Sequence, residues 1–437
     1  MSTDKTSRTS STDLGKPAAA PVDAPPPADA ASTAVDPRLL VREQGLGGYV
    51  GELKRKIRAG DLGALPVIVG LVIICIVFQS LNSNFLTAGN LSDISVAMVG
   101  TGMIAVGIVF VLLLGEIDLS VGSVSGVAGA AFAVLSILHG MNEWLALLLA
   151  ILTGAVAGAI HGFIFARIGV PAFAVTLAGL LFWNGFMLKI LGDNGTINTH
   201  DSGVFYNLSN YFFSDVAVAY GAAVVAVAVY FLSAFFDSRR REAAGVPSRP
   251  LSEIVLRTVL LAVVAFAVAY MFNQNKGLPL AVVIFLAVLI LTDFVLRRTS
   301  YGRMIFALGG SVEASRRAGI NIVMVRTSVF AISGTFAAVG GLFLASKISA
   351  ANQGAGSGDL LMNAIAAAVI GGTSLFGGRG RTWNALLGVL VIVSIQYGLA
   401  LEGVAAAIQQ MITGGVLLLT VIIDAVTRKT QKSAGRA

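Results

Sequence analysis

The chain has 437 residues, of which 56% are hydrophobic and 12% charged, and its formal net charge is +7 at pH 7. Soluble globular proteins carry about 25% charged residues, so this chain lacks the charge that a soluble surface of its size needs. The composition argues against a soluble enzyme and a nucleic-acid-binding protein, and the single Cys75 excludes an intrachain disulfide. It predicts an all-α polytopic membrane protein, in which the basic excess sets the orientation.

The first part of the chain differs from the rest. Residues 1–45 are rich in Ser, Thr, Ala, Pro and Asp and contain almost no large apolar residue. Such a segment buries too little apolar surface to offset the entropy of ordering, so we expect a disordered cytoplasmic tail. Residues 46–64, with four basic residues at 54–58, predict a short basic juxtamembrane segment on the inner membrane surface.

From residue 65 to 426 the sequence alternates apolar runs with short breaks, and this region is the predicted transmembrane domain. Residues 427–437 then form a cytoplasmic C-terminal tail. The run at 361–376 is short enough to be a broken or re-entrant helix. The predicted spans are 65–80, 96–114, 118–138, 144–166, 172–190, 216–236, 254–273, 279–296, 327–347, 361–376, 384–401 and 404–426.

The distribution of Lys and Arg gives the orientation of these spans. With the first segment inside, 27 of the 30 Lys and Arg residues fall on the inner face, and only Lys189, Lys276 and Lys347 fall outside. Cytoplasmic loops collect basic residues, so both termini are expected in the cytoplasm and the number of spans is even. We predict twelve spans, with ten as the alternative.

The first motif is GEIDLSVGS at residues 115–123, where Glu116 and Asp118 stand between two long apolar runs with almost no loop. An ionised carboxylate in hydrocarbon costs about 2.5–3.5 kcal/mol on insertion scales, so the chain turns at the interface or unwinds beside a water-filled cavity. Asp118 can cap the following helix, contact a transported solute, or take part in a proton relay. Too few ligands accompany it for a metal site.

The second motif lies in the cytoplasmic loop at residues 297–326. Its centre predicts a short helix at 312–318, with Ser311 as the N-cap, Glu313 in the first turn and Gly319 at the left-handed position that ends it.

The surface of this short helix is small and charged. Glu313 can pair with Arg316 and Arg317, and Ala314 and Ala318 leave a flat face. Such a helix suits docking into a groove of a partner protein. The other interpretation is a solvated loop whose arginines follow the positive-inside rule.

The third motif is AIAAAVIGGTSLFGGRG at residues 364–380. Two Gly-Gly pairs break the helix and leave the hydroxyls of Thr373 and Ser374 with free backbone groups around them. The motif is not a phosphate-binding loop, because the pattern G-x-x-x-x-G-K-[ST] occurs nowhere in the chain. His139, His161 and His200 show no ligand spacing, so we expect neither a metal site nor an enzyme.

Together the three motifs resemble the signatures of the monosaccharide-type permeases of bacterial ABC importers. That family's pattern reads G-G-I-D-L-S-V-G-S, then G-R-x-x-x-A-x-G-G-N-x-E-A-A-x-x-x-G-I, then A-I-A-A-x-x-x-G-G-T-S-L-x-G-G. The resemblance covers about residues 65–426. The extra loop and apolar pair at 216–273 resemble the longer xylose-type members rather than the ribose type.

The resemblance implies a homodimeric transmembrane subunit in the bacterial cytoplasmic membrane that receives a monosaccharide from an extracytoplasmic binding protein. A separate ABC subunit would bind ATP and Mg, and this chain would hold no cofactor. The expected coupling helix for that ATPase comprises Ser311, Glu313, Ala314, Arg316, Arg317 and Gly319. The residues expected along the substrate path are Glu116, Asp118, Ser120, Ser123, Asn363, Thr373 and Ser374.

Four positions depart from the family pattern. Glu116 stands where the pattern has Gly, which adds a carboxylate of unknown role. Ser311 replaces the usual Asn and Ser315 replaces an Ala, although both still suit a capped short helix. Asn363 stands where an acidic residue is common, which weakens any expectation of charge there.

The expected function is translocation of a sugar, with xylose first, by alternating access that the ATPase powers from outside the chain. The alternative is a proton-coupled secondary sugar transporter that uses Glu116 and Asp118. Such a transporter would need no partner, and the helix at 311–319 would then have no role. Membrane lipid is an expected contact, and nucleic acid is not.

Overall fold

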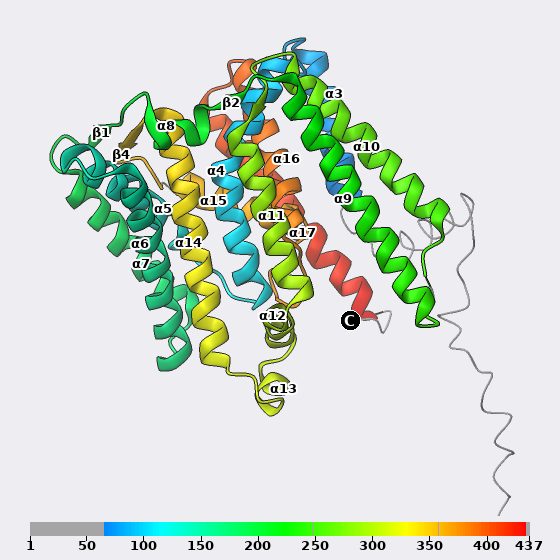
Figure 1. Cartoon of the computed structure of the whole chain (residues 1–437). Helices are drawn as coiled ribbons and strands as arrows, with labels where there is room; N and C mark the ends of the chain where they lie inside the picture. The colour runs from blue at the N-terminus through cyan, green and yellow to red at the C-terminus, as the bar shows by residue number, and fades with distance from the viewer. Residues whose placement is uncertain (1–64, 247, 357, 434–437) are drawn as a thin grey trace, which may run out of the picture.

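The computed structural model describes residues 65–246, 248–356 and 358–433. Within these ranges the chain is almost entirely helical, and the long helices lie side by side in one bundle (Figure 1). The predicted tail at 1–45 and the basic segment at 46–64 lie outside the described residues.

The bundle consists of long helices that alternate in direction, joined by short connections. They are α3 (Leu65–Leu81), α4 (Ala88–Leu113), α5 (Val121–Ala133), α6 (Glu143–Phe163), α7 (Ala172–Leu191), α9 (Val216–Ala243), α10 (Leu251–Asn273), α11 (Leu280–Arg298), α14 (Ile322–Ile348), α15 (Gly358–Ile370), α16 (Thr382–Leu401) and α17 (Ala406–Ser433). The shorter helices are α8 (Gly203–Asn210), α12 (Ser300–Gly310) and α13 (Val312–Arg317). The π-helical turns Val134–Leu138 and Ile164–Ile168 extend α5 and α6.

Nine helices among the described residues are long and apolar enough to cross a membrane. Three shorter apolar segments, Leu65–Leu81, Gly358–Ile370 and Ala406–Leu419, occupy the places of the remaining predicted spans. The polytopic all-α fold is therefore confirmed, while the count of twelve and the cytoplasmic placement of both termini stay predictions. The helix α17 continues to Ser433, beyond the predicted end of the last span.

Polar side chains start several of the long helices at the positions where backbone N–H groups lack helical partners. Thr87 accepts from the Asn90 N–H at the start of α4, and Asn142 accepts from Trp144 at the start of α6. Asp215 and Asn321 cap α9 and α14 in the same way. These caps explain where each helix begins, because the apolar runs themselves contain no other signal for a helix start.

The core of the bundle surrounds α4, which is buried along nearly its whole length. It packs against α14, α15, α16 and α11. The pair α9 and α10 pack mainly against each other and have few buried residues, so they form the edge of the bundle (Figure 1). The extra apolar pair predicted at 216–273 is thus a peripheral addition to the core.

Small residues bring α6 and α14 into backbone contact. A Cβ atom added at Gly158 would lie 2.1 Å from the Phe330 carbonyl oxygen, and one at Gly334 would lie 2.1 Å from that of Gly154. Small residues permit this approach in membranes, where lipid offers no hydrophobic drive between helices. The glycines therefore serve close helix packing at this crossing.

The two ends of the bundle differ. At one end lie two short antiparallel sheets, β1 (Thr196–Asn198) with β4 (Ala350–Asn352) and β2 (Phe212–Phe213) with β3 (Leu278–Pro279). At the opposite end α13 projects from the bundle (Figure 1). The predicted orientation places α13 in the cytoplasm.

Candidate functional site: an exposed short helix joined to two loops

The short helix α13 forms as the sequence predicts. The Ser311 hydroxyl oxygen accepts a hydrogen bond from the Ala314 N–H at 3.2 Å. Gly319 ends the segment in the left-handed conformation, with φ of +77°. Glu313 and Arg316 form an ion pair at 3.7 Å, which contributes little because both side chains are exposed.

The side chains expected to meet a partner are all exposed to solvent. Only Ser315 of α13 is buried, on the side that faces the bundle. The exposed members are Ser311, Glu313, Ala314, Arg316, Arg317 and Gly319. Their place at the end of the bundle leaves them free for contact with another protein (Figure 1).

The three motifs meet directly behind α13, although they are far apart in the sequence. The Gly378 N–H of the third motif donates to the Leu113 carbonyl at 2.9 Å, at the end of α4. A Cβ added at Gly309 would lie 1.8 Å from that same carbonyl oxygen. A Cβ at Gly115 would lie 3.3 Å from the Phe376 carbonyl oxygen. The end of α12, just before α13, therefore touches both the end of α4 before the first motif and the third motif.

The third motif folds into a closed loop after α15. Thr373 and Ser374 are buried, and their hydroxyl groups hold the loop together. The Asn384 side chain donates to the Thr373 hydroxyl at 3.3 Å, and the Phe376 N–H donates to the Ser374 hydroxyl at 3.1 Å. Both predicted path residues thus shape the loop that contacts α4 and α12.

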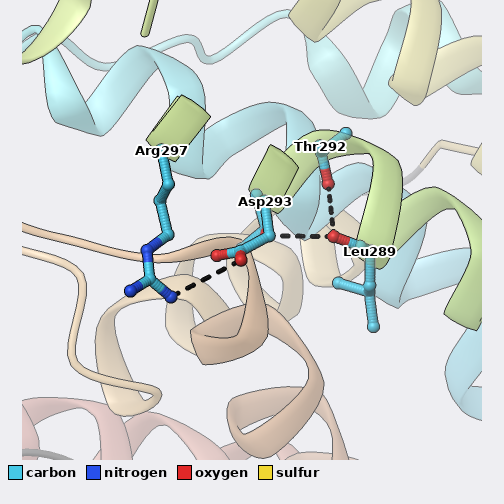
Figure 2. Close-up of polar contacts among 5 residues, drawn as sticks. Leu289, Thr292, Asp293 and Arg297 are labelled. Carbon is cyan, nitrogen blue, oxygen red and sulfur yellow. Dashed lines mark hydrogen bonds and ion pairs between the residues drawn. The ribbon is translucent and has the colours of Figure 1, made fainter. Parts of the chain in front are cut away.

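The helix α11 joins this region from the side. The Thr382 hydroxyl at the start of α16 and the Thr292 hydroxyl both donate to the Leu289 carbonyl, at 3.4 and 3.2 Å. Figure 2 shows Asp293 and Arg297 one turn apart on the same helix, where they form an ion pair at 3.5 Å. The end of the third motif is thereby tied to α11.

Glu116 faces the base of α14. It forms an ion pair with Arg326 at 3.7 Å, and the Arg326 guanidinium lies 4.4 Å from the centroid of the Phe165 ring. Burial raises the pKa of Glu116 above its ordinary value, and the positive charge of Arg326 opposes that rise. Because Arg326 lies on the first turns of α14, which follows α13 in the chain, the pair links this part of the chain to the first motif.

Asp118 faces the interior of the bundle instead. Its Oδ1 accepts from the Ser120 N–H at 3.0 Å and from the Ser120 hydroxyl at 2.6 Å. Its Oδ2 accepts from the Ser333 hydroxyl at 2.9 Å, which belongs to α14. The carboxylate therefore joins the loop before α5 to α14, and Asp118, Ser120 and Ser123 are all buried.

The network continues to His161 on α6 and Trp183 on α7. The Trp183 Nε1–H donates to His161 Nε2 at 3.1 Å, and His161 Nδ1 lies 3.1 Å from the Ser120 hydroxyl. An indole N–H can only donate, so Nε2 is the acceptor and Nδ1 carries the proton toward Ser120. Ser120 in turn donates to Asp118. Gly179 leaves room for the imidazole ring.

The structure therefore separates the two carboxylates of the first motif. Glu116 pairs with a cation near α13, and Asp118 sits in a buried network that spans α5, α6, α7 and α14. Sequence reasoning missed His161, Trp183, Ser333 and Arg326. The sequence feature that could have identified them is a polar or ionisable side chain within or beside an apolar span, because such a side chain marks function or a specific partner.

Asn363 lies elsewhere, on the wall of a cavity between α15, α16 and α17. It does not meet the other predicted path residues, because α15 separates it from the third-motif loop. Among the described residues no three His, Cys, Asp or Glu side chains gather in a way that could hold a metal ion.

Comparison with known proteins decides the family. A family model described as the permease component of the branched-chain amino acid transport system matches residues 90–421. The chain belongs to this permease family. The match covers every element of the site described above.

Individual relatives agree with this assignment. The permease is 33% identical over 386 residues to the xylose transport system permease protein of Escherichia coli (strain K12), which covers 88% of this chain and 95% of the relative. It is 32% identical over 376 residues to that of Haemophilus influenzae, covering 86% and 99%. The ribose import permease protein of Escherichia coli (strain K12) is 30% identical over 357 residues, covering 82% and 92%.

The resemblance to monosaccharide-type ABC permeases predicted from the three motifs is thus confirmed. The permease is a multi-pass protein of the bacterial cytoplasmic membrane. No solved structure matches the chain.

Proposed function

We propose that this permease is the transmembrane subunit of an ATP-driven importer that translocates a pentose, with xylose as the first candidate. The observation that carries the proposal is the 33% identity to a xylose permease across 95% of that relative. The family's own description refers to amino acids, so the proposal of a sugar rests on the individual relatives.

The proposed mechanism is alternating access powered from outside the chain. A separate ATPase would bind the exposed face of α13, and an extracytoplasmic binding protein would deliver sugar to a dimer of the permease. Movement of α13 would reach the first and third motifs through the contacts at Leu113, Gly309 and Gly378. Arg326 and Glu116 would carry the same movement to α14.

The proton-coupled alternative gains no support from this arrangement. A relay through Glu116 and Asp118 calls for two carboxylates with a shared path, whereas these two have different partners. The exposed helix α13 would also have no role in such a transporter.

The test is sugar uptake by the permease reconstituted in liposomes with the ATPase and binding protein that copurify with it. ATP is supplied inside and no ion gradient is applied. We expect uptake of labelled xylose that requires all three proteins. Unlabelled leucine should not reduce this uptake. Uptake by the permease alone, driven by a proton gradient and abolished by Asp118→Asn, would show that the alternative is correct.

A further inference from the structure

The cavity beside Asn363 is lined by both polar and apolar side chains. It has a volume of about 370 Å³ and lies between the first turns of α15, the last turns of α16 and the first turns of α17. This places it toward the end of the bundle opposite α13. Its polar lining consists of Asp359, Asn363, Gln396, Gln409, Gln410 and Thr413.

Polar side chains in membrane-spanning segments are costly and mark substrate pathways by default. The amides of Asn363 and Gln396 have no hydrogen-bond partner among the described residues. The Gln409 amide nitrogen donates to the Val404 carbonyl, which leaves its oxygen free to accept. These donors and acceptors belong to side chains that are only partly buried, so they can reach a molecule inside the cavity.

The rest of the lining holds these groups in place. The Gln410 amide donates to the Asp359 carboxylate, which links α17 to α15 across the cavity. The Thr413 hydroxyl donates to the Gln409 carbonyl at 2.9 Å and keeps its lone pairs available. The cavity thus presents amide donors, amide oxygens and a carboxylate, with Asp359 and Gln410 at its exposed rim.

The chemistry of the lining indicates the class of ligand. An amide offers both a donor and an acceptor, which matches a hydroxyl group that needs both. The lining residues include no Lys or Arg, so the carboxylate of an amino acid would find no cation there. The volume lies at the lower end of the range of about 300–1,000 Å³ for small-molecule sites.

We propose that this cavity binds the transported molecule, and that the molecule is a neutral polyhydroxylated compound of monosaccharide size. The inference rests on the proposed function and adds the place and chemistry of the binding site. The amides of Asn363, Gln396 and Gln409 hydrogen-bond the hydroxyl groups, and the Asp359–Gln410 contact orients them.

The first test uses labelling of a cysteine in the cavity. In cells that carry the permease with Cys75→Ala, Thr413→Cys is treated with a charged methanethiosulfonate reagent, and xylose uptake is measured. We expect labelling to lower the uptake rate about tenfold, the equivalent of ~1.4 kcal/mol, and excess xylose to slow the labelling. The matched control is Gln274→Cys, an exposed position at the end of α10, where labelling leaves uptake unchanged.

The second test removes the amides. Gln409→Ala and Asn363→Ala each lose one or two hydrogen bonds to the ligand, so uptake should fall about tenfold at equal amounts of permease in the membrane. Gln274→Ala should not change it. Competition by unlabelled ribose, glucose and leucine should shift in these variants, because the contacts that distinguish the ligands are altered.

The outcomes separate this inference from the proposed function. If the unmodified permease imports sugar, but the labelled and amide-free variants import it equally well, the cavity is not the binding site and the proposed function stands. If the unmodified permease imports leucine and no monosaccharide, both proposals are wrong.

Discussion

The indole N–H of Trp183, in the middle of α7, donates a hydrogen bond over 3.1 Å to His161 Nε2, in the last turn of α6. Because the indole cannot accept, this bond decides which nitrogen of His161 carries the proton. The protonated Nδ1 then faces Ser120, and Ser120 faces Asp118. Trp183 thereby fixes the donor-to-acceptor direction of a chain of hydrogen bonds that ends at Asp118 in the first motif.

Trp183→Phe tests this chain. Phenylalanine keeps an aromatic ring in contact with Phe182 and Phe186 but removes the donor, so His161 Nε2 loses its partner. A buried polar group without a partner costs about 1–3 kcal/mol, and we expect the unfolding temperature of the purified permease to fall. Trp144→Phe is the control, because Trp144 is exposed. Equal shifts for the two variants would mean that the bond does not stabilise the bundle.

The junction of the three motifs makes a second prediction. In Gly309→Ala the new methyl group would lie 1.8 Å from the Leu113 carbonyl oxygen and 2.8 Å from the Gly378 nitrogen, so α12 must move away from α4. The neighbouring Gly310→Ala meets nothing within 4 Å. We expect Gly309→Ala to abolish ATP-dependent uptake while Gly310→Ala retains it, at equal amounts in the membrane. Retained uptake in both would show that the contact is not needed for coupling.

Sequence reasoning predicted the local structure of α13 correctly, because its determinants are local. The Ser311 cap, the short helix and the left-handed Gly319 all depend on residues within one turn. It also predicted the membrane helices, since each reports its own apolar length. It could not predict that Leu113, Gly309 and Gly378 meet, because that contact depends on the packing of α4, α12 and α15 together.

The two carboxylates of the first motif likewise have partners that the sequence could not predict, because those partners lie on other helices. Glu116 and Asp118 stand two residues apart, and the proton-coupled alternative gave them one shared role. The turn between α4 and α5 points them at different partners, Arg326 and Ser333. His161 was set aside because it lacked metal spacing, and only the fold brings it to Ser120.

The crossing of α6 and α14 gives a third prediction. Gly158→Ala would place a methyl group 2.1 Å from the Phe330 carbonyl oxygen, against backbone that cannot give way without separating the helices. Overpacking of this kind costs about 1–3 kcal/mol. Gly185→Ala on α7 meets nothing within 4 Å. Thermal unfolding in detergent should therefore show a loss for the first variant only, and a similar loss for both would contradict the role of Gly158 in packing.

The raised pKa of Glu116 should make the stability of the permease depend on pH. Burial raises its pKa above the ordinary value of 4.5, so the folded protein holds the proton more tightly than the unfolded chain does. The resulting stability is fully present below pH 4.5, and it is lost as the pH rises through the pKa that Glu116 has in the folded protein. Relative to Glu116→Gln, the unmodified permease should lose stability as the pH rises above 4.5 and through the folded pKa. A difference between the two unfolding temperatures that stays constant over this range would contradict the shift.

Gly319 allows the backbone conformation at the end of α13 to be tested apart from its contacts. Its φ of +77° is strained for any residue with a Cβ, yet a Cβ there would meet nothing within 4 Å. Gly319→Val should therefore distort the end of α13 through the backbone alone, at a cost of about 1–2 kcal/mol, and lower ATP-dependent uptake. Gly319→Asn should retain most of it, because Asn tolerates the left-handed region. The ATPase rate of the assembled complex, measured beside uptake, shows whether the lost transport reflects lost coupling. Loss in Gly319→Asn equal to that in Gly319→Val would show that the glycine is needed for close contact with the partner and not for its backbone angle.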